Sequence, residues 1–396
     1  MRLLAFVFCG VLVVGCASTV PASSPSSYMP NGVSAGPFSG SSYTVLHRFA
    51  GYPNDGTGPF SGVTDVNGAL YVATYFGGDG CSDSFQCGAV VSLKTSGSES
   101  LVYSFKGNPD GERPFGGLTL VGTTLYGTTQ VGGKYGQGAV FTIASGKEKV
   151  IHDFGGGSSD GSYPRATLLD VNGTLYGTTF SGGAEGLGTI YSITTSGTET
   201  LLYSFAGGKD GARPFAPLTE VNGELYGTTY NGGKANKGTV FEVSTAGKEK
   251  VLHDFKGLPD GSEPLAGLTD VNGTLWGDTG LGGTHDDGSV FTITTSGKEK
   301  VVYSFAGGSD AAKPDDALTL VGSTLYGTST QGGASSDGTV FSITTSAKEG
   351  VLYSFKGGTD GATPDASLTY VGTTLYGTTR LGGTPGNFGT VFAISP

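Results

Sequence analysis

The sequence predicts an all-β fold, a seven-bladed β-propeller with four-stranded antiparallel blades. One unit recurs seven times along the 396 residues: Y-S-F-x-G-x-x-D-G-x-x-P, then L-T-x-V-x-G-x-L-Y-G-T-T, then G-G-x-x-x-x-G-T-V-F-x-I. Its phenylalanine stands at Phe49, Phe105, Phe154, Phe205, Phe255, Phe305 and Phe355. Spacings of 49 to 56 residues are typical of a repeat architecture, and each unit holds four short runs of β-forming residues.

The four predicted strands of a unit are clearest in the fourth copy. They cover residues 218–221, 225–229, 239–243 and 250–255. Asn222-Gly223 between the first two is a strong signal for a type I′ hairpin turn. Antiparallel strands joined by tight turns, four to a unit, favour a propeller blade. A right-handed β-helix would need parallel coils and a shorter period.

The long connection fixes the order of strands within a blade. The segment G-x-x-D-G-x-x-P is long enough to cross from an outer strand to the inner strand of the next blade. L-T-x-V is then innermost, L-Y-G-T-T second, T-V-F-x-I third and V-L-Y-S-F outermost. The chain therefore begins with an orphan outermost strand at 45–49 and ends with a third strand at 391–394. We expect the N-terminal strand to complete the last blade, leaving no unpaired sheet edge.

Composition supports a large core and excludes some partners. Hydrophobic residues make up 36% of the chain, and the 73 glycines recur at fixed places in the unit, as turn and close-packing residues do. Charged residues are scarce at 14%, the net charge is −11, and no basic run occurs. Nucleic acid and anionic lipid headgroups are therefore poor partners, and we expect a monomeric body.

The N-terminus predicts export and a lipid anchor. Arg2 precedes an almost wholly apolar stretch, and Val13-Val14-Gly15-Cys16 resembles the lipobox of bacterial lipoproteins. That resemblance implies a signal peptide over 1–15 and lipidation of Cys16. Ala17, in place of an inner-membrane retention aspartate, implies the outer membrane or cell surface. A plain secretory signal is the alternative, because short signals have low specificity. Residues 16–42 read as a Ser/Pro/Gly-rich tether, and 43–396 as the propeller.

Cys81 and Cys87 stand six residues apart in one insertion. In an exported protein this spacing predicts a local disulfide. A metal site would need further cysteine or histidine ligands nearby, and the insertion has none.

The repeated motif L-Y-G-T-T, with G-G and G-T-V-F downstream, resembles the Gloeobacter/Verrucomicrobia (GloVer) tandem-repeat family of exported bacterial proteins. The resemblance covers residues 43–396. It implies a propeller body with a surface anchor, and it implies no particular biochemical activity. Two units depart from the motif: the first has Val72 and Ala73 in it, and the fifth has Trp276 and Asp278.

The repeated acids and histidines favour structural roles. An aspartate occurs once per unit, at Asp55, Asp110, Asp160, Asp210, Asp260, Asp310 and Asp360. A ring of cation-binding carboxylates is one interpretation, but an Asp-Gly turn that binds its own loop explains the pattern alone. His47, His152 and His253 occupy the slot of Tyr103, Tyr203, Tyr303 and Tyr353, which makes them packing alternatives. We predict no metal site and no cofactor.

Function on a symmetric scaffold is expected where the copies differ. The residues after the repeated proline should stand at one mouth of the central channel: Phe60, Phe115, Arg165, Phe215, Leu265, Asp315 and Asp365. A second variable loop follows strand two and should lie on the same face: Tyr75, Phe76, Phe180, Tyr230, His285, Asp286, Asp287 and Arg380. The hairpins at 146–149, 247–250 and 297–300 carry Gly-Lys-Glu-Lys and predict a solvated opposite face.

An aromatic and acidic rim predicts a binding module for a glycan, a peptide or a partner protein. The binding residues would be Phe60, Phe115, Arg165, Phe215, Asp315, Asp365, His285, Asp287 and Arg380. The alternative is a polysaccharide lyase or hydrolase, with Asp315, Asp316 and Asp365 as acid–base groups and Arg165 stabilising charge. A structural envelope protein without a small ligand is the third hypothesis.

Overall fold

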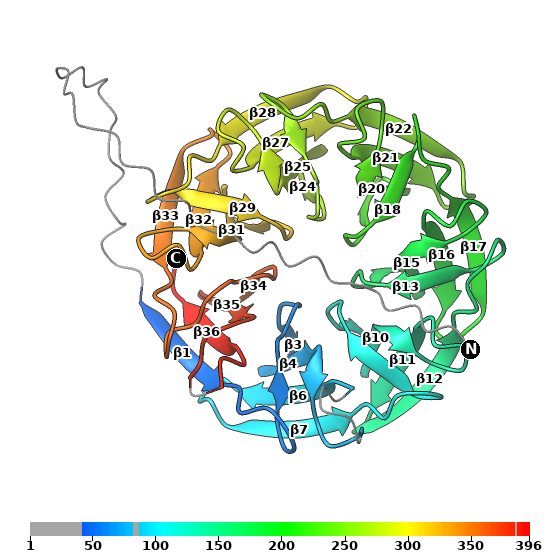
Figure 1. Cartoon of the computed structure of the whole chain (residues 1–396), viewed down its shortest axis with the longest axis vertical. Coiled ribbons are helices and arrows are strands. Elements are labelled where there is room, and N and C mark those ends of the chain that lie inside the picture. The colour runs from blue at the N-terminus through cyan, green and yellow to red at the C-terminus, as the bar shows by residue number, and fades with distance from the viewer. Residues whose placement is uncertain (1–41, 82–86, 385) are drawn as a thin grey trace, which may run out of the picture. The chain divides into compact units, whose positions relative to one another are not determined.

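The computed structural model describes residues 42–81, 87–384 and 386–396, and these form a ring of small antiparallel sheets (Figure 1). The predicted signal peptide, the lipidated Cys16 and most of the tether lie outside the described residues. Within the described part, no helix is long and apolar enough to cross a bilayer.

The first four blades each contain four strands, ordered from innermost to outermost. They are β3 (Thr64–Val66), β4 (Ala69–Thr74), β6 (Ala89–Lys94) and β7 (Glu99–Ser104); β9 (Thr119–Val121), β10 (Thr124–Gly132), β11 (Ala139–Ala144) and β12 (Lys147–Asp153); β14 (Leu169–Val171), β15 (Thr174–Gly182), β16 (Thr189–Thr194) and β17 (Glu199–Ser204); β19 (Thr219–Val221), β20 (Glu224–Gly232), β21 (Thr239–Ser244) and β22 (Glu249–Asp254).

The last three blades repeat this order. They are β24 (Thr269–Val271), β25 (Thr274–Thr279), β27 (Ser289–Thr294) and β28 (Glu299–Ser304); β30 (Thr319–Val321), β31 (Thr324–Gly332), β32 (Thr339–Thr344) and β33 (Glu349–Ser354); β34 (Thr369–Val371), β35 (Thr374–Thr379), β36 (Thr390–Ile394) and β1 (Tyr43–Arg48). The seven-bladed all-β fold and the predicted strand order are confirmed.

The connection between blades differs from the prediction of a plain loop. In six of the seven connections it contains a short strand that pairs with the end of strand two or with the segment after it, and the connection into the last blade has only an isolated bridge between Ala362 and Leu381. These short strands are β2 (Gly56–Thr57), β8 (Gly111–Pro114), β13 (Gly161–Pro164), β18 (Gly211–Pro214), β23 (Gly261–Ser262) and β29 (Ala311–Pro314), with β5 (Phe76–Gly77) and β26 (Leu281–Gly282) as separate partners. Gly132 opposes Gly111, and a Cβ on Gly132 would lie 2.7 Å from the Glu112 nitrogen. Glycine is needed there because the backbones approach so closely, at a φ of 79°.

The N-terminal strand closes the ring. β1 pairs antiparallel with β36, from Tyr43 opposite Ile394 to Arg48 opposite Thr390. The inner strands add a second closure, because a threonine hydroxyl donates to a carbonyl of the next blade in six of the seven blades. Thr369 Oγ1, for example, donates to the Val63 oxygen at 2.6 Å and joins the last blade to the first.

The core lies between blades, in seven apolar clusters that each combine residues of two neighbours. The repeated phenylalanine directly follows the outermost strand and is buried in every copy. Phe205 meets Phe241 of the next blade edge to face, with 5.3 Å between ring centroids. The glycine of L-Y-G-T-T makes room for this ring: a Cβ on Gly227 would lie 2.5 Å from Phe241 Cζ.

Candidate functional site

The seven variable residues that follow the repeated proline line one cavity of about 880 Å³. Each is half-buried, while the proline before it is buried. The residue before each proline has a left-handed φ, from 53° at Thr363 to 60° at Arg113, and glycine (Gly58) takes this place in the first blade. This uncommon conformation in non-glycine residues turns the chain sharply, just before the side chain that reaches the cavity.

The second variable loop reaches the cavity only in part. Phe180, Tyr230 and Arg380, which directly follow strand two, are among the lining residues. His285 and Asp287 stand several residues further along their loop, and neither lines the cavity. His285 Nδ1 lies 3.0 Å from the Thr284 hydroxyl, and Asp286 accepts from the Gly282 N–H at 2.9 Å. The structure therefore does not bring His285 and Asp287 together with the other predicted binding residues.

Aromatic rings form one wall of the cavity. Phe60 and Phe115 of adjacent blades stack with 4.6 Å between centroids. Phe115 meets Phe215 edge to face at 5.2 Å, and Tyr75 packs against Phe60 at 5.1 Å. These contacts hold the rings in fixed geometry, so the wall presents rigid apolar faces to whatever enters.

Arg165 is held within this aromatic wall. Its guanidinium lies 4.0 Å from the centroid of Phe180 and 5.2 Å from that of Phe215. The amide orientation of Gln130 that satisfies both of its neighbours accepts from Arg165 Nε at 3.0 Å and donates to the Tyr75 oxygen at 2.7 Å. Burial lowers the pKa of Arg165, but a guanidinium remains charged in proteins.

Carboxyl groups form the opposite wall. Burial raises the pKa of Asp315 well above its usual range, and the like charges of Asp365, Asp278 and Asp316 add to this. Burial also raises the pKa of Asp316 to about 7, although the N–H groups of Ala317 and Ser367 each donate to it at 2.7 Å. Each carboxyl is half-buried at the cavity wall. The surrounding blades exclude much of the water that would stabilise its charged form, and this raises its pKa.

Arg380 joins the two walls. Its Nε lies 3.3 Å from Asp365 Oδ2, and its guanidinium lies 5.2 Å from the centroid of Phe60. Burial raises the pKa of Asp365, and the charge of Arg380 opposes that rise. The cavity is therefore polarised, with aromatic rings and Arg165 on one side and three carboxyl groups on the other.

Asp278 does not line the cavity, but it is a buried carboxyl whose charge acts on Asp315 in the acidic wall, and sequence reasoning missed this. It is 1% exposed, and neither carboxyl oxygen has a hydrogen-bond partner among the described residues. Burial, followed by the charge of Asp316, raises its pKa well above the usual range. In five of the other six blades threonine holds this position and donates to a carbonyl of the next blade, as Thr228 does to Ala266 at 2.9 Å; the first blade has Ala73. The departure from L-Y-G-T-T was the available signal.

The repeated aspartate binds its own loop, as the turn hypothesis predicts. Asp210 Oδ2 accepts from the Ala206 N–H at 2.8 Å, and Oδ1 accepts from the Gly211 N–H at 2.7 Å. The predicted solvated hairpin face is found at its lysines, which are exposed, but its glutamates are only partly solvated. Glu148, Glu249 and Glu299 each bury one carboxyl oxygen, because the propeller packs each hairpin against the neighbouring blade. A Cβ on Gly297, for instance, would lie 2.9 Å from the Leu252 oxygen of that blade.

The predicted disulfide between Cys81 and Cys87 is present, with 5.7 Å between the two Cα atoms. The sulfurs pack beside Gly107, where a Cβ would lie 3.3 Å from Cys87 Sγ. The bridge therefore closes the insertion of the first blade and packs it against the loop that leads into the second blade.

Comparison with known proteins identifies the repeat and the architecture. A family model described as the Gloeobacter/Verrucomicrobia repeat matches residues 36–241 and 132–337. No curated protein matches the chain. Among solved structures, the N-terminal domain of Nup159 is similar at a TM-score of 0.50 and 12% identity, over 91% of this chain and 98% of that one.

Two lactonase-like structures are also similar. A candidate 6-phosphogluconolactonase of Bacteroides uniformis has a TM-score of 0.49 and 14% identity, over 76% of this chain and 86% of its own. A candidate gluconolactonase has a TM-score of 0.43 and 14% identity, over 90% and 92%. At such identities a likeness shows the fold alone, so neither structure bears on the ligand of this cavity.

Proposed function

The chain belongs to the Gloeobacter/Verrucomicrobia repeat family, and from that premise we propose that the family repeat builds the scaffold while the polarised cavity binds a ligand. The observation that carries this proposal is the position of the seven residues in which the copies differ. All seven line the same cavity. A structural protein without a small ligand is disfavoured, because the channel mouth holds an open volume of about 880 Å³ that no side chain of the described residues plugs.

The ligand that fits this cavity best is a carbohydrate. A sugar ring has an apolar face, which suits stacking on Phe60 and Phe115, and hydroxyl groups, which suit the carboxyls of Asp315 and Asp365. The volume is within the range of pockets that enclose a small ligand, about 300 to 1,000 Å³. Arg165 and Arg380 would donate hydrogen bonds to ring or carboxylate oxygens of the sugar. The proposal is therefore a glycan-binding module without catalytic activity.

The bacterial repeat family and the disulfide fit an exported protein. We further propose that the body is monomeric and anchored through a lipid on Cys16, at the outer membrane or the cell surface. Support comes from the lipobox-like residues before Cys16 and from Ala17 after it. Metabolic labelling with a palmitate analogue tests the anchor. Label that persists in a Cys16→Ser variant would contradict it.

A glycan array, with a peptide array beside it, tests the binding function. We expect the purified full chain to bind one class of glycan, with binding reduced at least 10-fold by Phe60→Ala, Phe115→Ala or Asp365→Ala. Tyr135→Ala is the matched control, because Tyr135 is a 54% exposed aromatic residue that does not line the cavity. If the protein bound peptides selectively and no glycan, the proposed ligand class would change from a glycan to a peptide. Binding that is unchanged in all three cavity variants would show that this cavity is not the binding site.

One observation favours an enzyme as the second candidate, a polysaccharide lyase or hydrolase. Asp315 and Asp365 are neighbouring carboxyls with unequal surroundings: burial and like charges raise the pKa of Asp315, while Arg380 opposes the rise at Asp365. Such a pair can divide acid and base roles. Incubation of the glycans that bind with the purified chain, followed by mass spectrometry, tests this. Cleavage abolished by Asp315→Asn would support it, and intact glycans would exclude it for those substrates.

A further inference from the structure

Six places around the outside of the ring bring two carboxylates from neighbouring blades together. We call each of them a seam. A seam contains the repeated aspartate that follows one outermost strand, and the glutamate that begins or nearly begins the next outermost strand. The third member is the tyrosine or histidine of the strand that precedes the aspartate. The seams are Asp55/Glu99, Asp110/Glu148, Asp160/Glu199, Asp210/Glu249, Asp260/Glu299 and Asp310/Glu349.

Three seams carry a tyrosine. Tyr103, Tyr203 and Tyr303 donate to their aspartates at 2.8, 3.0 and 3.0 Å. Burial, followed by the charge of the aspartate, raises the pKa of the opposing Glu148, Glu249 and Glu349 to about 7. A proton on the glutamate therefore relieves the repulsion between the two carboxylates in a tyrosine seam.

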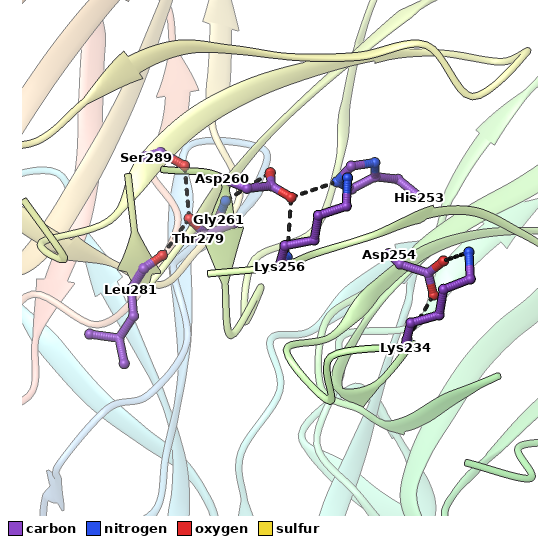
Figure 2. A network of polar contacts seen from close by, with 9 residues as sticks. All are labelled: Lys234, His253, Asp254, Lys256, Asp260, Gly261, Thr279, Leu281 and Ser289. Atoms are coloured by element: carbon purple, nitrogen blue, oxygen red, sulfur yellow. Dashed lines mark hydrogen bonds and ion pairs between the residues drawn. The ribbon is translucent and has the colours of Figure 1, made fainter. Parts of the chain in front are cut away.

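The other three seams carry a histidine. His47 Nε2 lies 2.9 Å from Asp55, and His152 Nε2 lies 3.9 Å from Asp160. His253 Nε2 lies 3.2 Å from Asp260 Oδ2, and Figure 2 shows this imidazole directed at the carboxylate that also accepts from Lys256 N–H. In each histidine seam one nitrogen and two carboxylate oxygens lie within 4.8 Å of one another.

The histidine seams also leave ligand atoms without partners. The buried Oε1 atoms of Glu99, Glu199 and Glu299 have no hydrogen-bond partner among the described residues, as is also true of the glutamates in the tyrosine seams, so the imidazole is what sets the histidine seams apart. The same holds for His152 Nε2, so in that seam both an imidazole nitrogen and a carboxylate oxygen are unpaired. A cation at the centre of the triad would coordinate these atoms and neutralise both carboxylates.

We propose that the three histidine seams, His47/Asp55/Glu99, His152/Asp160/Glu199 and His253/Asp260/Glu299, each bind a divalent transition-metal ion of the zinc class. Imidazole nitrogen and carboxylate oxygen are both ligand types that zinc accepts, and water would complete the coordination of this three-ligand set. Calcium is a poorer fit because it prefers oxygen ligands alone. The seam at His253 should be the weakest, since the nearby positive charge of Lys256 acts on Glu299.

The proposed metal-binding role of the three histidines differs from the prediction that they only replace tyrosine in packing. The sequence places the three histidines in separate blades, and a metal shared among them is excluded by distance around the ring. Each one instead meets acids from its own loop and from the adjacent blade. The proposal does not depend on the cavity or its ligand.

Metal analysis after equilibrium dialysis against micromolar zinc chloride tests the proposal, with the full chain purified without a histidine tag. We expect three zinc ions per chain. His47→Tyr, His152→Tyr and His253→Tyr should each remove one ion, and the triple variant should bind none. Tyrosine is the matched replacement because the sibling seams carry it, so the fold is retained. His285→Asn, in a loop outside the seams, should leave three ions bound.

A gain-of-site variant and a stability readout complete the test. Tyr203→His converts a tyrosine seam into a histidine seam and should raise the stoichiometry to four. Zinc should raise the melting temperature of the wild-type chain and leave that of the triple variant unchanged. No bound zinc, or a stoichiometry that is unchanged in the folded triple variant, would overturn the proposal.

Discussion

The ring of Tyr43 stacks on the ring of Tyr353, with 3.8 Å between centroids and 12° between planes. Tyr43 is the first residue of β1, and its hydroxyl also donates to the backbone carbonyl oxygen of Asp360 at 2.8 Å. It occupies the position that a seam glutamate holds in the other outermost strands. The seventh junction between blades therefore has an aromatic clasp where the other six have a pair of carboxylates.

Tyr43→Ala should weaken this clasp. The change removes the stack on Tyr353 and the contact with Phe392, whose centroid lies 5.7 Å away. We expect the free energy of unfolding to fall by about 2 kcal/mol, less than the ~3 to 5 kcal/mol for loss of a fully buried aromatic side chain, because Tyr43 is only half-buried. Urea denaturation measures this. Thr44→Ala, at an exposed position of the same strand, should cost less than about 0.5 kcal/mol. Equal losses in both variants would contradict the role of the stack.

Gly227→Ala should destabilise the fourth blade. The new methyl group would meet Phe241 Cζ at 2.5 Å and Leu218 Cδ2 at 2.9 Å, and overpacking of this kind costs about 1 to 3 kcal/mol. Gly280→Ala is the control, because its Cβ would meet nothing nearer than 3.5 Å.

The first blade suggests the rescue. Val72 there faces Val91, where the other six blades pair glycine with an aromatic ring. Phe241→Val should therefore recover part of the loss caused by Gly227→Ala. A double-mutant cycle measures this coupling. Strict additivity of the two changes would show that the methyl and the ring do not compete for space.

The tyrosine seams should make stability depend on pH. Folding raises the pKa of Glu148, Glu249 and Glu349 from 4.5 to about 7, so the folded state binds more protons than the unfolded state between these values. Their contribution is fully present below pH 4.5 and is lost as the pH rises to about 7. Melting temperatures from pH 4 to 8 should therefore fall less in the triple Glu→Gln variant than in the wild type. An identical pH dependence of the two proteins would refute this assignment.

Asp278→Thr should stabilise the protein. It removes two buried carboxyl oxygens without partners among the described residues and restores the hydroxyl that donates to the next blade elsewhere. We expect a gain of about 1 to 3 kcal/mol in the free energy of unfolding at neutral pH, the usual penalty of an unsatisfied buried polar group. Thr228→Asp is the reverse test and should lower stability. A loss of stability in Asp278→Thr would mean that the carboxyl has a stabilising partner.

Local pattern was sufficient to predict the blades, the strand order and the strand that closes the ring. Asn222-Gly223 and the alternating runs around it specify a hairpin without any information from outside the unit. The seven cavity residues were also predictable, because each follows a proline at the same point of the repeat. Their shared position in the unit becomes a shared position in space.

Contacts between blades could not be predicted in the same way. Asp210 and Glu249 meet because the propeller sets two outermost strands side by side, and no pattern within one unit encodes that distance. The unpaired carboxyl of Asp278 depends likewise on packing against the next blade. His285 and Asp287 were predicted at the cavity because their loop begins on the right face, yet neither residue lines it.

Each cavity residue stands in the sequence directly between two residues that belong to the scaffold. The proline before each is buried, and the residue after it is buried in six of the seven blades. A combinatorial library randomised at positions 60, 115, 165, 215, 265, 315 and 365 would therefore rewrite the lining while the interblade packing is left intact. Variants that bind different ligands could then be selected from one scaffold by changing only these seven codons.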